Sequence, residues 1–176
     1  NTPTGAMHLI FSKPIFIILC KFVQKYNMKS FFEEIFTYQN EVNQDILKQI
    51  GELDKLASEK IMDLLSHCIN AHKLWNYRIL GKTEKVVFQT YSKEELVILD
   101  TQNFKDTLFI CLKTDLNKQV NYKSTSGKAY YNTIQEVLTQ VSQHFQYHRG
   151  QIVSALKKHN IQLKPTDYIY YRRKEV

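Results

Sequence analysis

The sequence predicts an all-α protein, a four-helix bundle with a short β-hairpin before the last helix. Four long segments carry apolar residues at helical spacing, and one stretch near residues 119–131 changes to the spacing of short strands. Only five Gly and three Pro occur in 176 residues, which is typical of a mostly helical chain. A chain of this length fits one domain, so these elements favour a single bundle with a sizeable core.

The first helix is expected over residues 31–50. Ser30 and Glu33 have the spacing of a capping box, in which each side chain satisfies a backbone N–H at the start of a helix. The apolar residues that follow keep one helical face: Phe32, Ile35, Phe36, Val42, Ile46 and Ile50.

Residues 1–29 are interpreted as lying outside the bundle, which is assigned to residues 30–176. Residues 1–7 resemble a cloning scar. Residues 9–23 are apolar but interrupted by Lys and Pro, and they are shorter than the roughly 20 residues of a membrane-spanning helix. A signal-peptide core, a short docked segment and translated upstream sequence all fit this stretch, and we favour the last, with the translation start at Met28 rather than Met7. No membrane association is expected.

Two further helices are expected in the middle of the chain. The second starts near Ser58 and stops at Gly81, a residue suited to the left-handed conformation after a helix. The third begins at a second capping box, Ser92 with Glu95, and continues to Ile110.

The last helix is expected over residues 133–159, after a hairpin that turns at Lys-Ser-Thr-Ser-Gly. Thr133 and Glu136 form a third capping box, and Asn160 with Pro165 ends the helix. The tail from residue 166 to residue 172 is rich in tyrosine, so we expect it to pack back on the bundle rather than extend into solvent.

Cysteine usage and charge limit the compartment and the partners. The three cysteines are scattered and odd in number, which favours a reducing, cytoplasmic environment over a disulfide framework. The net charge is +7, but residues 1–29 carry four lysines and no acid, and the C-terminal residues add more positive charge. The body between them is close to neutral, so nucleic-acid binding is not expected.

Two histidines stand within the apolar stripe of the last helix. His144 and His148 are four residues apart, so their imidazoles project from one face and can share one divalent metal ion. Two separately hydrogen-bonded core histidines are the alternative. The third ligand would come from the second helix, where His67 and His72 lie about 140° apart around the axis. Periodicity slightly favours His72, and the residues alone leave the choice open.

Other chemistry has little support in the sequence. Motifs for phosphate loops, serine nucleophiles and metalloprotease helices are absent, so catalytic residues are not assigned. Gly150, in the middle of the last helix, costs roughly 1 kcal/mol relative to Ala, and a close approach by another element is the predicted reason.

Three stretches resemble the DinB/YfiT-like family of metal-binding four-helix bundles: LLSHCINAHKLWNYRI (64–79), HFQYHRGQI (144–152) and TDYIYYRR (166–173). The resemblance extends over about residues 28–173 and includes the hairpin before the last helix. It implies that His67, rather than His72, joins His144 and His148 in binding a divalent metal, zinc or nickel. Relatives often carry another histidine where this chain has Gln140, a difference that leaves the three-histidine set intact.

The resemblance also implies what the protein could do. The family includes thiol-dependent S-transferases, a thiol-dependent isomerase and proteins described as metal-dependent hydrolases. A small-molecule substrate, a low-molecular-weight thiol and a homodimer are therefore expected. From the residues themselves, Arg149 and the tail tyrosines are the candidate basic and aromatic rim for such a thiol. The alternative is a non-catalytic metal- or ligand-binding bundle with a role in stress response.

Overall fold

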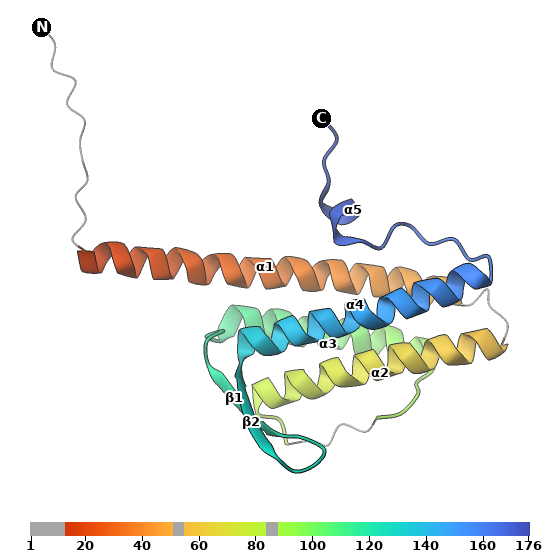
Figure 1. Cartoon of the computed structure of the whole chain (residues 1–176), viewed down its shortest axis with the longest axis horizontal. Helices are drawn as coiled ribbons and strands as arrows, with labels where there is room; N and C mark the ends of the chain where they lie inside the picture. The colour runs from red at the N-terminus through yellow and green to blue at the C-terminus, as the bar shows by residue number, and fades with distance from the viewer. Residues whose placement is uncertain (1–12, 51–54, 84–87) are drawn as a thin grey trace, which may run out of the picture.

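Four long helices lie side by side in the computed structural model (Figure 1). The structure describes residues 13–50, 55–83 and 88–176, with side chains from residue 28 onward and, in the second helix, from residue 58. The long helices are α1 (Lys13–Ile50), α2 (Lys55–Leu80), α3 (Lys93–Lys113) and α4 (Ile134–Lys158). The predicted all-α bundle with a hairpin before its last long helix is confirmed.

Helix α1 is longer than the sequence pattern indicated. It begins at Lys13 instead of residue 31, so Ser30 lies inside the helix and its pairing with Glu33 does not mark a helix start. The physical reason is that no residue between 15 and 30 breaks a helix, while Pro14 lies in the first turn, where proline is tolerated. The N-terminal end of α1 extends beyond the other helices (Figure 1). Residues 1–12 lie outside the described part of the chain.

The predicted boundaries of the other helices are close to those observed. The Ser92 and Thr133 capping boxes both form, with each hydroxyl accepting from the backbone N–H of the glutamate three residues on. Gly81 ends α2 with φ +67°, in the left-handed region where glycine carries no Cβ penalty. Asn160 follows α4 with φ 60°.

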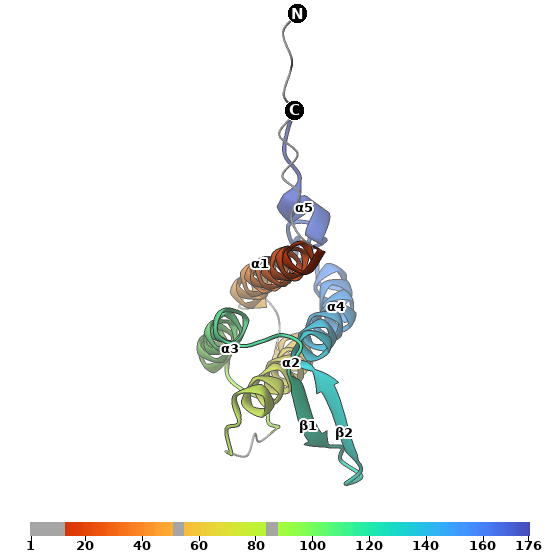
Figure 2. The same cartoon turned by 90° about the vertical axis from the view of Figure 1, so that its left-hand side faces the viewer.

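The hairpin consists of β1 (Gln119–Lys123) and β2 (Ala129–Thr133), paired antiparallel with Gln119 opposite Thr133. Gly127 supplies a φ of +82° at the turn. Because β2 leads directly into the N-cap of α4, the hairpin fixes where α4 begins beside α2. Figure 2, which looks along the bundle, shows the hairpin next to α2 and α4, on the side of the molecule away from α1.

The C-terminal tail packs on the bundle, as the sequence predicted. It contains a short helix, α5 (Tyr168–Arg172), beside α1 and α4 (Figures 1 and 2). The ring of Tyr38 on α1 lies 5.3 Å from that of Tyr168, centre to centre, and its hydroxyl donates to the carbonyl of Thr166. A salt bridge between Arg172 Nε and Glu34 Oε1, which are 3.0 Å apart, also joins the tail to α1.

The interior combines an apolar core with a group of buried polar side chains. Aliphatic and aromatic residues from all four long helices form the core, including Phe36, Leu65, Leu96 and Leu138. Alongside them lie buried polar residues, among them Asn43, Asn70, His72, Asn76, Asp100, Asn103, Thr107 and Arg149. Cys68 and Cys111 are buried and unbridged. Within the described residues, no helix combines the length and apolar character needed to cross a membrane.

Candidate metal centre

Three histidine side chains converge where α2 packs against α4. His67 Nε2 lies 3.2 Å from His144 Nε2, and the His148 ring is centred 5.1 Å from the His67 ring and 4.7 Å from the His144 ring. One nitrogen from each of the three lies within 4.8 Å of the other two. The structure therefore brings together the three residues that the family resemblance indicated.

The positions of these histidines follow from the helix geometry. On α4, His144 and His148 are one turn apart and project together. They lie half-buried at the margin of a stripe whose centre is occupied by Val141, Phe145 and Ile152. On α2, His67 is exposed while its neighbour Cys68 is buried. The cluster is therefore at the edge of the core, where a small molecule can reach it.

The surroundings favour neutral imidazoles. Burial lowers the pKa of His67 below its ordinary value, and the nearby His148 lowers it further. Burial also lowers the pKa of His144, with His148 and His67 as additional causes. A neutral imidazole keeps a lone pair available for a metal ion, so the electrostatics of the site suit ligation.

Gln151 lies next to the third histidine. Its Oε1 is 3.4 Å from His148 Nδ1. If Nδ1 carries the proton and donates to this oxygen, the lone pair of His148 is on Nε2, and the amide then orients the ring. Gln151 is one turn beyond His148 on α4, and this partner was not predicted from the sequence, although its three-residue spacing permits the contact.

Aromatic side chains flank the cluster. Phe88, in the segment between α2 and α3, lies 6.2 Å from the His67 ring, and Tyr147 lies 5.0 Å from the His148 ring, centre to centre. Both are exposed. The prediction that Arg149 and the tail tyrosines form the rim is wrong: Arg149 is buried and donates to Tyr38 on α1, and the tail packs beside α1. Arg149 follows His148 directly, so it projects about 100° away around α4.

His72 has a different environment from the cluster. It is buried, and its Nε2 lies 2.7 Å from Thr107 Oγ1 on α3. Phe36 and Phe145 contact its ring. The slight preference for His72 that periodicity gave is wrong for the cluster, because a residue in register with the core stripe is held inside the core.

The donor set fits a tetrahedral metal ion. With metal–nitrogen distances of about 2.0–2.1 Å, two imidazole nitrogens on a tetrahedral ion are roughly 3.3 Å apart. The 3.2 Å between His67 and His144 matches this separation, and a ring nitrogen of His148 lies within 4.8 Å of both. Three imidazole nitrogens leave one tetrahedral position for a further ligand.

These features define a class: α-helical bundles with a hairpin before the last long helix and a cluster of histidines between the second and fourth helices. A sequence model of the DinB family matches residues 28–175, and the chain belongs to that family. It is 26% identical over 163 residues to Protein DinB of Bacillus subtilis (strain 168), a match that covers 82% of this chain and 95% of that protein. No solved structure was matched.

Proposed function

We propose that His67, His144 and His148 bind one divalent metal ion, Zn²⁺ or Ni²⁺. The observation that supports this most is the convergence of three imidazoles from two helices at a partly exposed position, where burial lowers the pKa of His67 and of His144. Imidazole is a good ligand for both ions. With Gln151 orienting His148, the chain supplies three ligands and an ordered partner for one of them.

We further propose that the protein is a metal-dependent enzyme acting on a small molecule, as a thiol-dependent S-transferase or a hydrolase. A bound metal ion would lower the pKa of a thiol or water at the open position and so provide a nucleophile near neutral pH. The chain's own contribution is to hold three ligands and to flank the site with Phe88 and Tyr147, whose exposed rings offer apolar contact to a substrate.

Metal content of purified variants tests the ligand assignment. The wild-type protein should carry one equivalent of Zn²⁺ or Ni²⁺ after loading and desalting, measured by elemental analysis. His148→Ala should lose it. His72→Ala should keep it, because His72 bonds to Thr107 instead. Circular dichroism should show that each variant is folded before its metal content is read. Retention of stoichiometric metal by His148→Ala would refute the assignment.

Turnover tests the enzymatic part of the proposal separately. The metal-loaded protein should consume an electrophile together with a low-molecular-weight thiol, or hydrolyse an ester or amide, and His148→Ala should not. If the loaded protein turns over nothing in a broad panel while its metal content is one equivalent, the alternative of a non-catalytic metal- or ligand-binding bundle is favoured.

We also propose a homodimer. Apolar side chains are exposed on α3 and near the middle of α1: Phe109 and Leu112 are 53% and 62% exposed, and Phe31 is 49% exposed. Covering them in a dimer would remove apolar surface from water. Sedimentation velocity at micromolar concentration should give the dimer mass for the wild-type chain and the monomer mass for Phe109→Glu.

A further inference from the structure

A cavity of about 480 Å³ lies between α4 and the C-terminal tail. Its charged lining residues are Arg149, Lys157, Lys164 and Asp167, and Gln146 and Gly150 of α4 also line it. Because Arg149 and His148 are consecutive on α4, the cavity and the histidine cluster lie on different sides of that helix. The cavity is thus separate from the candidate metal centre.

Arg149 is a buried cation without a carboxylate partner. It is 3% exposed, and its hydrogen bonds both leave from Nη1, to the Tyr38 hydroxyl at 2.7 Å and to Gln146 Oε1 at 3.1 Å. Its Nε has no hydrogen-bond partner. Among the described residues, no Asp or Glu oxygen lies within 4.0 Å of its guanidinium. A guanidinium has five N–H donors, and a buried charge that is neither paired nor fully hydrogen-bonded is costly.

Asp100, the interior carboxylate whose charge acts on Arg149, accepts its hydrogen bonds from other side chains. Asp100 on α3 accepts hydrogen bonds from Asn43, Asn40 and Gln44 at 2.9, 2.9 and 3.0 Å. Three amides from α1 therefore occupy its oxygens. The donors of Arg149 stay available to another anion, one that is not part of the described chain.

Gly150 is the second feature that points to a ligand. It lies in the middle of α4, where glycine costs about 1 kcal/mol relative to alanine. No neighbouring heavy atom lies within 4 Å of the place where its Cβ would be, so the predicted close approach by another element is wrong. The missing side chain instead leaves space in the cavity wall next to Arg149.

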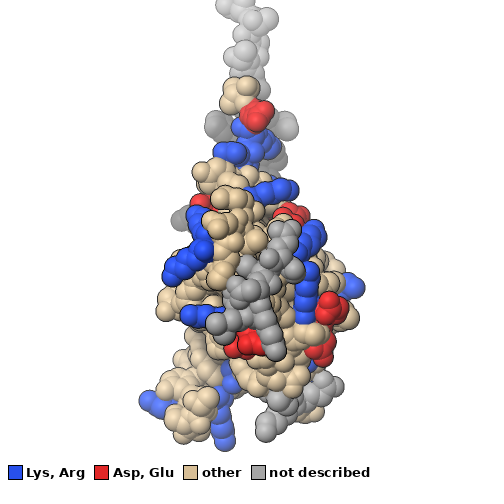
Figure 3. Space-filling model, turned by 90° about the vertical axis from the view of Figure 1, so that its right-hand side faces the viewer, with Lys and Arg blue, Asp and Glu red and all other residues tan. Residues whose placement is uncertain are grey.

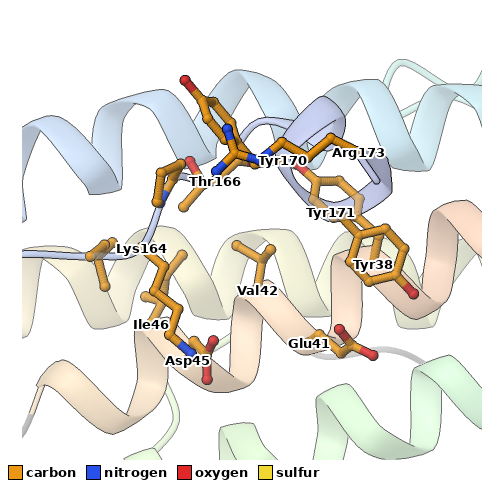
Figure 4. A pocket seen from close by; sticks show the side chains of 12 residues that line it. Tyr38, Glu41, Val42, Asp45, Ile46, Lys164, Thr166, Tyr170, Tyr171 and Arg173 are labelled. Atoms are coloured by element: carbon orange, nitrogen blue, oxygen red, sulfur yellow. Dashed lines mark hydrogen bonds between the residues drawn. The ribbon is translucent and has the colours of Figure 1, made fainter. Parts of the chain in front are cut away.

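The charges around the cavity favour an anion. Three cationic side chains and one carboxylate, Asp167, line it. A neighbouring cavity of about 330 Å³ lies between the tail and α1, where Glu41 and Asp45 form part of the wall (Figure 4). Lys164 lines both cavities. The carboxylates of α1 thus belong to the second cavity, and the positive side chains predominate in the first.

We propose that the cavity between α4 and the tail binds the carboxylate or phosphate group of a small molecule. Arg149 anchors the oxyanion through its free guanidinium donors, and Lys157 and Lys164 contribute charge at the rim. A guanidinium matches the geometry of both oxyanions, so the shared chemistry is the prediction. This site does not depend on the metal proposal.

Isothermal titration with inorganic phosphate and with malonate, at constant ionic strength, tests the proposal. The full-length wild-type protein should bind at least one of the two probes. Gly150→Leu, which fills the cavity from an exposed helix position, should weaken binding at least tenfold. Ser154→Leu is the matched control: it adds the same side chain one turn further along α4, outside the lining, and should leave the affinity unchanged.

Two further variants separate this site from the histidine cluster and guard against misfolding. His148→Ala should bind the probe as the wild type does, whereas an anion held by a metal ion would be lost with the metal. Lys164→Gln, at an exposed position, should weaken binding about fivefold, the effect of roughly 1 kcal/mol. Absence of binding to both probes, loss of binding in His148→Ala, or equal affinity in Gly150→Leu and Ser154→Leu would each overturn the proposal.

Discussion

His67 Nε2 on α2 lies 3.2 Å from His144 Nε2 on α4, although the two residues are 77 positions apart in the chain. The contact exists only because these helices pack against each other along the bundle. The geometry of the candidate metal centre therefore depends on the packing of α2 against α4. The third member, His148, has its neighbour Gln151 on its own helix, so this contact does not depend on the packing of α2 against α4.

Removing the amide of Gln151 should weaken metal binding without abolishing it. In Gln151→Leu, the oxygen beside His148 Nδ1 is absent and the ring loses an orienting partner. Loss of such a partner typically costs 10–100-fold in affinity, and the long 3.4 Å contact places the expected loss near tenfold. Competition with a chromophoric chelator measures it. Gln143→Leu, at an exposed position of α4, is the control, and equal affinities for both variants would contradict the role of Gln151.

His72 should make the fold less stable in acid. Burial lowers its pKa to about 3, well below the ordinary 6.5. Its Nε2 lies beside Thr107 and its Nδ1 has no partner, so the folded state holds a neutral ring while the unfolded chain takes up a proton. The free energy of unfolding therefore falls as the pH drops from about 6.5 towards 3, by about 1.4 kcal/mol per pH unit.

Urea unfolding at pH 7 and pH 4.5 checks this effect. In a His148→Ala background, where metal release makes no contribution, the chain with His72 should lose about 2.5 kcal/mol more than the chain with His72→Leu, nearly all of it between pH 6.5 and pH 4.5. Parallel losses in the two proteins would show that His72 is not the residue responsible.

Asp100 should act in the opposite direction. Burial raises its pKa to about 6, against the effect of hydrogen bonds from Asn43, Gln44 and Asn40 and of the charge of Arg149. Between the ordinary value of 3.8 and about 6, the folded state binds more protons than the unfolded chain. This group's contribution to stability is thus present below pH 4 and lost as the pH rises through 6.

The pH dependence of the difference between Asp100→Asn and the wild type isolates that contribution. Relative to the wild type, the variant should gain about 3 kcal/mol of unfolding free energy as the pH rises from 4 to 7, whatever the offset between them at pH 4. A difference that is constant over this range would show that the buried carboxylate keeps an ordinary pKa.

Much of the fold follows from local sequence signals, and the exceptions have identifiable causes. The Ser92 and Thr133 capping boxes predicted two helix starts because each precedes a helix with no helical residues before it. The Ser30 pattern failed because the preceding residues also propagate a helix, so the same local bonding pattern does not create an end.

The residues of the candidate site were harder to predict from the sequence than the helices were. Spacing alone identified His144 and His148, but register with the core favoured His72, and only the family resemblance indicated His67. Register with the apolar core stripe indicates which residues are buried. A metal ligand that a small molecule can reach lies beside that stripe, as His67 does. The empty space beside Gly150 and the missing carboxylate partner of Arg149 depend on contacts between distant segments, which periodicity does not encode.

Tyr38 connects the tail to the bundle, so its hydroxyl should control both stability and tail docking. The oxygen accepts from Arg149 Nη1 at 2.7 Å and from Gln146 Nε2 at 3.2 Å, and the hydroxyl donates to the Thr166 carbonyl. Tyr38→Phe removes all three bonds and leaves the buried guanidinium with one acceptor, Gln146 Oε1. Loss of a hydrogen bond to a buried charge costs about 1.5–3 kcal/mol, and urea unfolding should show a loss of that size.

The same change should expose the tail. In Tyr38→Phe, hydrogen exchange of the α5 amides should accelerate, and trypsin should cleave faster after Arg172 and Arg173. Tyr168→Phe is the matched control, because it removes a tail hydroxyl that bonds to the partly exposed Glu34 and leaves the contacts of Arg149 intact. It should cost less stability than Tyr38→Phe. If the two variants are equally stable, the buried cation gains nothing from Tyr38, and the tail is held by its surface contacts alone.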